Sequence, residues 1–342
     1  MPDGWSGCGS TCRCRPAWPP PSSPGGGTAQ HPGNRPDPAL PTRFSRPLTR
    51  ERHTVITIVG ATGATGSALL RRLIEREVPC RAVSRTPDNL RAALGTNTPV
   101  EIVGADAADP QTLRDAFEGS TQLFLAMANS PRQAELETNV IDAAAHCGVR
   151  HVVKLSAPAA EPASPVAISR SHWQVEEHLA KTAMTATLLR PYAFMQKLLL
   201  NAPAIAEGVL IGAMREAPCN YIDVRDIADV AAETLLRPSL AGATYTLTGP
   251  RAFSHPELAR LLGELTGHPV RYIDLPPSEF HTHLLSTAHM PPWLASHVVE
   301  IQQLAIARPE SPNDTIESIL GRPARTLHTF LREHLHTFTK TA

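Results

Sequence analysis

The sequence predicts an α/β protein built on a doubly wound parallel sheet, with a small, mostly helical C-terminal lobe. Three observations lead to this fold class. A β-branched run at 54–59 reads as a buried strand, the segment 60–66 is rich in glycine, and a helical pattern of apolar residues follows at once. Strand and helix patterns then alternate up to about residue 240, which is typical of a parallel sheet covered by helices on both faces.

Each element follows from its own local pattern. Further strands are expected at 80–84, 100–103, 122–126, 151–156 and 185–189, and helices at 67–77, 87–94, 110–117, 131–146, 169–181 and 224–236. Beyond 240 we expect short strands at 244–248 and 270–273, and a helix that a capping box from Ser254 to Glu257 opens. From 276 on the pattern is mostly helical. The expected domains are 53–240 and a C-terminal substrate lobe at 241–342 packed on the sheet edge.

Composition limits the function classes. The 342 residues can bury a sizeable core, and 32 basic residues balance 32 acidic ones. This balance argues against nucleic-acid binding by bulk charge. No stretch is long and apolar enough for a membrane span, and six cysteines in this length are no disulfide framework. We therefore expect a cytoplasmic protein whose partner is a small molecule.

Residues 1–50 differ in kind from the rest of the chain. They hold 11 of the 33 prolines and 7 of the 21 glycines, without an apolar period. Such a composition cannot offset its ordering entropy, so we expect a disordered tail. Cys8, Cys12 and Cys14 lie close together there, but no second ligand pair suggests a metal site.

The glycine-rich segment is the main functional motif. Gly60, Gly63 and Gly66 form GxxGxxG between the first strand and the first helix. A diphosphate must approach backbone N–H groups at a helix N-terminus, and a Cβ would block that approach. A glycine-rich turn without a ligand is the alternative, but the strand–turn–helix context favours a dinucleotide.

The ends of the second and third strands bear on the choice of cofactor. An NAD site usually has an acidic residue after the second strand, whereas this chain has Ser84 and Arg85. Arg85 is placed to bind a 2′-phosphate, which predicts NADPH over NADH; alternatively, it only faces solvent. After the third strand, Asp106 is expected at the adenine and Asp109 at the N-cap of the next helix.

Several segments of the sequence resemble the NmrA-like branch of the atypical short-chain dehydrogenase/reductase superfamily. The resemblance is carried by 60–66, 106–110, 189–195, 223–230, 247–250, 291–294 and 321–326, and it covers roughly 53–336. It implies a Rossmann-type domain, NAD(P) binding and a small C-terminal substrate lobe. Its members either reduce quinones or related conjugated compounds with NADPH, or bind the dinucleotide as non-catalytic redox sensors.

The resemblance also suggests which residues line the site. Ser156 takes the place of a hydroxyl beside the nicotinamide, Ala126 and Met127 lie near it, and Tyr192 and Phe194 form an apolar wall with Pro191; a strand-ending hydroxyl and an ordinary aromatic core are the alternatives. The full set expected to contact the cofactor is Gly60, Thr62, Gly63, Ala64, Thr65, Gly66, Arg85, Asp106, Ala126, Met127, Ser156, Tyr192 and Phe194.

The Tyr-x-x-x-Lys pair of the standard superfamily is missing. None of the four tyrosines has a lysine four residues on; by resemblance, His172 takes the Lys position and Ile168 the Tyr position. Glu176 shares a helix face with His172, so we expect it to orient His172 and raise its pKa; a surface pair is the alternative. His172 and Ser156 are the catalytic candidates.

This loss bears on the substrate. A simple ketone becomes a very basic alkoxide on reduction, whereas a quinone becomes a phenolate-type oxygen that can be protonated later. We therefore expect an NAD(P)H-dependent oxidoreductase of a small quinone-like acceptor. A non-catalytic NADP sensor with a protein partner is the alternative, and an epimerase is disfavoured without Tyr-Lys. His281 and His283 lack further ligands for a metal site, and Arg225 and Asp226 are expected in an ion pair or helix start.

Overall fold

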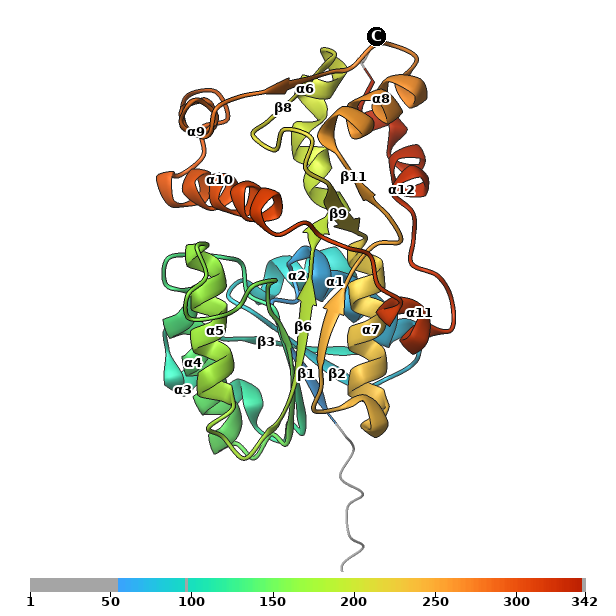
Figure 1. Ribbon diagram of the computed structural model, residues 1–342. Coiled ribbons are helices and arrows are strands. Elements are labelled where there is room, and N and C mark those ends of the chain that lie inside the picture. The colour runs from blue at the N-terminus through green and yellow to red at the C-terminus, as the bar shows by residue number, and fades with distance from the viewer. Residues whose placement is uncertain (1–54, 96–97, 340–342) are drawn as a thin grey trace, which may run out of the picture. The chain divides into compact units, whose positions relative to one another are not determined.

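A computed structural model describes residues 55–95 and 98–339, so the prediction for residues 1–50 lies outside the described residues. Seven parallel strands form one sheet in the order β10-β6-β5-β4-β1-β2-β3 (Figure 1). These strands are β1 (Ile56–Val59), β2 (Cys80–Ser84), β3 (Val100–Gly104), β4 (Gln122–Leu125), β5 (His151–Leu155), β6 (Thr185–Pro191) and β10 (Thr244–Leu247). The predicted doubly wound parallel sheet is confirmed.

Helices cover both faces of this sheet. One face carries α1 (Ala64–Glu75), α2 (Pro87–Leu94) and α7 (Val224–Leu236), and the other carries α3 (Pro110–Phe117), α4 (Gln133–His146) and α5 (Ala167–Leu179). Proline at the first position starts α2 and α3, because its fixed φ suits that position and its missing N–H costs nothing there. The side chain of Asp109 caps α3, as predicted, by accepting the N–H groups of Gln111 and Thr112.

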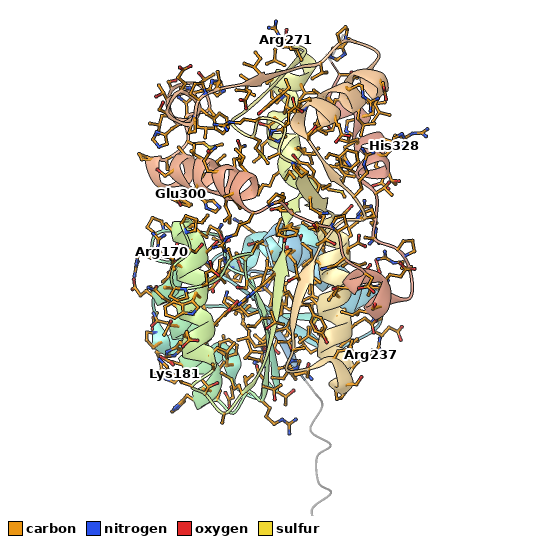
Figure 2. All side chains as sticks on the ribbon, viewed as in Figure 1. Arg170, Lys181, Arg237, Arg271, Glu300 and His328 are labelled. Carbon is orange, nitrogen blue, oxygen red and sulfur yellow. The ribbon has the colours of Figure 1, made fainter. Side chains whose placement is uncertain are left out.

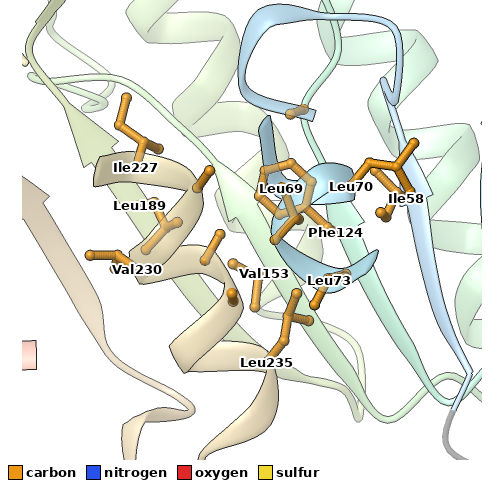
Figure 3. Packing of buried hydrophobic residues seen from close by; sticks show 14 of the residues in the cluster. Ile58, Leu69, Leu70, Leu73, Phe124, Val153, Leu189, Ile227, Val230 and Leu235 are labelled. Carbon is orange, nitrogen blue, oxygen red and sulfur yellow. The ribbon is translucent and has the colours of Figure 1, made fainter. Parts of the chain in front are cut away.

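Two hydrophobic clusters hold the layers together. Figure 3 shows the first, in which Leu69 of α1 lies beside Phe124 of β4 and Ile227 of α7 lies beside Leu189 of β6. The second lies on the opposite face. Alternation along the strands sends Ile58 to one cluster and its neighbour in β1, Val59, to the other. Each such side chain, fully buried, contributes about 1.5–3 kcal/mol.

The remaining elements gather beyond the carboxyl ends of the strands (Figure 1). They are β7 (Ala193–Phe194), η1 (Met195–Asn201), α6 (Ala202–Ala206), β8 (Val209–Gly212), β9 (Cys219–Ile222), β11 (Ala252–Phe253), α8 (His255–Thr266), β12 (Arg271–Asp274), α9 (Pro277–Ser286), α10 (Pro292–Ala307) and α12 (Leu327–Glu333). They form sheets β11-β9-β7 and β12-β8 and a third cluster around Met195, Tyr221 and Phe330. The capping box of Ser254 and Glu257 opens α8 as predicted.

The chain passes between the large sheet and this group of elements more than once. Residues 193–222 belong with α8 and α12, whereas β10 returns to pair with β6, and α11 (Thr315–Leu320) packs on α7. The elements on either side of residue 240, where we expected a domain boundary, are therefore interleaved.

Helix α10 comes over the beginning of α5. The Glu300 carboxylate accepts the N–H of Ala167, the first residue of α5, at 2.9 Å, and Figure 2 labels Glu300 at this approach. On its other side, α10 binds the chain after β8, where the Gln302 side chain accepts the N–H of Ala213. No helix within 55–95 and 98–339 is long and apolar enough to cross a membrane.

Candidate active site

The glycine loop joins β1 to α1, and two of its glycines are required by the loop itself. Gly60 has φ +89°, and a Cβ there would lie 2.0 Å from the carbonyl oxygen of Ala126. A Cβ on Gly66 would lie 2.1 Å from the carbonyl oxygen of Gly60. Both positions bring backbone against backbone, so any side chain would force the loop away from β4 and α1 apart from β1.

Gly63 stands in a different environment, because a Cβ there would meet only the Gly60 oxygen, at 3.3 Å. It is the N-cap of α1, where no side chain caps the helix and no acidic residue occupies the first turn. The first N–H groups of a helix have no partner within it, and they carry its positive dipole end. The hydroxyl of Thr65 is buried there and has no hydrogen-bond partner among the described residues.

These features fit a diphosphate. The backbone of 64–66 offers N–H donors, Thr65 adds a hydroxyl, and the missing Cβ of Gly63 leaves space for the anion. Thr62, an exposed residue, and Ala64 flank Gly63 in the same turn. Beside this loop, a groove of about 480 Å³ opens between α1 and α2, with Thr62, Ser67 and Asn89 among its lining residues.

The residue after β2, Arg85, has a side chain without a bonding partner among the described residues. Arg85 is exposed and makes no ion pair or hydrogen bond with any residue that the structure describes. The nearest following carboxylate in the sequence, Asp88, is committed to Arg91 at 2.7 Å. Ser84 is buried, and its hydroxyl accepts the N–H of Thr86 at 3.1 Å. A free guanidinium and no free acidic side chain therefore stand at this strand end.

Asp106 follows β3 and is exposed. Its Oδ1 accepts the N–H of Ala108 at 2.9 Å, which fixes the carboxylate in the turn before α3. On the strands nearer the centre, Ala126 lies against Gly60 and Met127 is half-buried.

The wall expected after β6 is partly exposed. The N–H of Tyr192 bonds to the carbonyl oxygen of Leu247 in β10, and Phe194 pairs with Ile222 of β9. Both side chains are half-buried. Burial raises the pKa of Tyr192, and the neighbouring Glu310 raises it further, so its phenol is neutral near pH 7.

Around His172, the structure reveals a buried polar cluster. The Nζ of Lys154, which is fully buried in β5, lies 2.7 Å from the Oε2 of Glu137 in α4. The same Nζ lies 3.0 Å from Nδ1 of His172 and 2.9 Å from the carbonyl oxygen of Leu155. Gln133 of α4 closes the cluster, with its side-chain nitrogen 3.1 Å from Nε2 of His172.

The expectation that Glu176 orients His172 and raises its pKa is wrong. Glu176 instead pairs with Arg190 of β6 and accepts the hydroxyl of Ser156 at 2.5 Å. His172 is buried, and burial together with the ammonium of Lys154 lowers its pKa well below the usual value. The alternative of a surface pair fails too, since both side chains are buried. Although they share a helix face, His172 contacts Lys154 of β5 and Glu176 contacts Arg190 of β6.

The other candidates have structural contacts. Asp223 caps α7 and pairs with Arg225, and Asp226 pairs with Arg322 and Arg325, so the ion-pair expectation is confirmed. His281 bonds to Ser296. In the described part of the chain, no group of three or more His, Cys, Asp and Glu could hold a metal ion.

The fold and the glycine loop together define the fold class of the protein. A parallel sheet whose first strand runs through a glycine-rich turn into a helix is a Rossmann-type fold. The chain belongs to the NmrA-like family, whose model matches residues 52–334.

Characterised relatives are similar over nearly their full length. An NAD(P)H azoreductase from Xenophilus azovorans is 34% identical over 288 residues, which is 83% of this chain and 99% of the relative. A (4-alkanoyl-5-oxo-2,5-dihydrofuran-3-yl)methyl phosphate reductase from Streptomyces griseus is 32% identical over 286 residues, again 83% and 99%. The crystal structure of an NADPH-dependent quinone oxidoreductase from Escherichia coli, complexed with NADPH, matches with a TM-score of 0.74 at 28% identity, covering 82% of this chain and 99% of that one.

Proposed function

We propose that this protein is an NADPH-dependent oxidoreductase that reduces a small conjugated acceptor such as a quinone. The observation that carries the proposal is the glycine loop, where the uncapped end of α1, the space at Gly63 and the unpartnered hydroxyl of Thr65 fit a diphosphate. The relatives named as an azoreductase and a quinone oxidoreductase support it. When bound, the nicotinamide supplies a hydride, and the protein has to place the acceptor beside it.

The preference for NADPH rests on Arg85. Its guanidinium has no partner within the described ranges, so it is available for charge-assisted hydrogen bonds to a 2′-phosphate. Thr62 and Asn89 are polar residues that line the groove between α1 and α2. A carboxylate that would bind the ribose of NADH is not free at this strand end, since Asp88 pairs with Arg91.

The acceptor class is inferred from the side chains near α5, which have no proton to donate to a substrate. Ser156 donates its hydrogen to Glu176, and Glu176 in turn is paired with Arg190. His172 accepts from Lys154 and stays neutral, because its pKa is lowered by burial and by that ammonium. None of these groups can protonate the oxygen on the carbon that receives the hydride, as a simple ketone needs, whereas a conjugated acceptor can take its proton at a more distant atom.

Cofactor oxidation tests the proposal. NADPH absorbance at 340 nm is followed with a panel of quinones, an azo dye and unconjugated ketones. We expect turnover with the conjugated acceptors and little with the ketones. Comparable rates on both would refute the acceptor class. Tight NADPH binding without any oxidation would favour the sensor function, with a protein partner, over the enzyme.

A further inference from the structure

The segment between α10 and α11 crosses the carboxyl end of the large sheet (Figure 1). Asn313 holds it there: its N–H bonds to the hydroxyl of Thr248 at 2.9 Å, and its side chain donates to the carbonyl oxygen of Thr246 at 3.0 Å. This segment, residues 308–314, is called the strap below. It therefore lies against β10 and the residues that follow, beside the end of β6.

Glu310 is the acidic side chain that the strap turns inward. Its Oε2 accepts the N–H of Asn220 in β9 at 2.8 Å. Its Oε1 has no hydrogen-bond partner among residues 55–95 and 98–339. Asn220 is itself fully buried and bonds through its side chain to both backbone groups of Gly249, so the point of attachment is rigid.

The surroundings of Glu310 favour its protonated form, so that it gains and loses a proton near neutral pH. The titratable groups that face it are Tyr192 after β6 and Cys219 and Tyr221 of β9, and burial raises the pKa of all three, so they are neutral. The nearest arginine along the strap, Arg308, is paired with Glu161 at 2.7 Å. Glu310 makes no ion pair within the described part of the chain, and burial raises its pKa to about 7.

We propose that Glu310 is the residue that gives the reduced acceptor its proton. The inference rests on the proposed function, and on the attachment of the strap to Thr248, the residue after Leu247, whose carbonyl oxygen accepts the N–H of Tyr192 in the wall expected around the nicotinamide. The acceptor takes a hydride, with both electrons, from the reduced nicotinamide, and its negative oxygen or nitrogen then takes the proton from Oε1. The carboxylate that remains regains a proton from water, so one NADPH and one proton are consumed for each acceptor reduced.

This placement suits quinone acceptors in particular. In a simple ketone, the oxygen that needs a proton is bonded to the carbon that receives the hydride. In a quinone, conjugation carries the negative charge to an oxygen farther from the point of attack, whereas in an azo compound it stays on the adjacent nitrogen. A donor on the strap, an element separate from α5, can serve that distant atom while Ser156 donates its hydrogen to Glu176.

Glu310→Gln tests the proposal, because an amide keeps the size and can still accept the N–H of Asn220 but cannot act as an acid at neutral pH. Glu317→Gln is the matched control, an exposed glutamate nearby on α11. We expect kcat for quinone reduction to fall about 100-fold in Glu310→Gln, with the Kd for NADPH unchanged. Wild-type kcat should decrease as pH rises through about 7, and the profile of Glu310→Gln should be flat over that range.

Glu310→Asp keeps a carboxyl and should recover part of the rate together with a pH-dependent profile. A measurement without cofactor checks the titration itself. The unfolding free energy of Glu310→Gln minus that of the wild type should grow as pH rises from 4.5 to about 7, because only the wild-type folded state retains a proton over that range.

The outcomes separate the two proposals. Wild-type kcat and an unchanged pH profile in Glu310→Gln would overturn the role of Glu310 and leave the proposed function standing. If none of the tested acceptors supports NADPH oxidation by the wild type, both proposals fail together. Should Glu310→Gln not fold, a wild-type rate and a flat profile in Glu310→Asp would overturn the role.

Discussion

The ammonium nitrogen of Lys154 lies 3.0 Å from Nδ1 of His172, in a cluster where both side chains are buried. Glu137 balances the charge of Lys154 at 2.7 Å. His172 therefore accepts a hydrogen bond and remains neutral, which removes it as a proton donor to substrate. His172 instead fixes the position of the Lys154 side chain and links α5 to β5 and, through Gln133, to α4.

Lys154→Met should destabilise the fold by about 3–5 kcal/mol, because it leaves the buried carboxylate of Glu137 without a cation. Urea unfolding measures the loss. The double variant Glu137→Leu/Lys154→Met is the control, since it removes both charges. We expect it to be more stable than Lys154→Met alone, and a double variant less stable than the single one would contradict this account of the pair.

Arg85→Ala should weaken NADPH binding by about 10- to 100-fold and leave NADH binding unchanged, since only NADPH carries the 2′-phosphate. Fluorescence titration with both nucleotides gives the two dissociation constants. Arg332→Ala on α12 removes an equally exposed arginine that also has no partner among the described residues, and it serves as the control. Equal losses for the two nucleotides in Arg85→Ala would remove Arg85 from this role.

Stability should fall as pH falls from 6.5 to about 4, partly because of His255. Burial lowers the pKa of this side chain to about 4, so over that range the unfolded state binds a proton that the folded state does not. The loss for His255 alone is roughly 3 kcal/mol. Unfolding measured at pH 7.5 and pH 4.5 should show a smaller drop for His255→Gln than for the wild type. An identical drop in both proteins would contradict the assignment.

Gly66→Ala should prevent stable folding, whereas Gly63→Ala should fold normally. The added Cβ at position 66 would lie 2.1 Å from a backbone oxygen, and the one at position 63 would lie 3.3 Å from the same atom. Circular dichroism and thermal unfolding of the two variants check this difference. Similar melting temperatures for the two variants would contradict the prediction that a Cβ at position 66 cannot be accommodated.

Where local signals are strong, the sequence predicted elements closely. The helices Pro87–Leu94, Pro110–Phe117 and Val224–Leu236 and the strand Cys80–Ser84 have the predicted bounds. Proline at the first helical position marks the first two of these helices clearly. The segment 193–222 carries no such signal, because its strands are two to four residues long and too short to show a period.

The contacts of the candidate site were less predictable than its elements. Lys154 and His172 lie 18 positions apart, on a strand and a helix, and only the packing of α5 on β5 brings them together. Glu310 sits on the strap, which has no motif. In contrast, the glycine loop could be predicted, since its strand, turn and helix are continuous in sequence.

The proposed function depends on binding of a pyridine nucleotide's diphosphate by the loop at 60–66. Isothermal titration calorimetry of NADPH with the wild type and with folded Gly63→Ala measures this binding. We expect micromolar or tighter binding to the wild type and a large loss in Gly63→Ala, whose Cβ would occupy the space left for the anion. No heat of binding with the wild type, or equal affinity in both proteins, would contradict it.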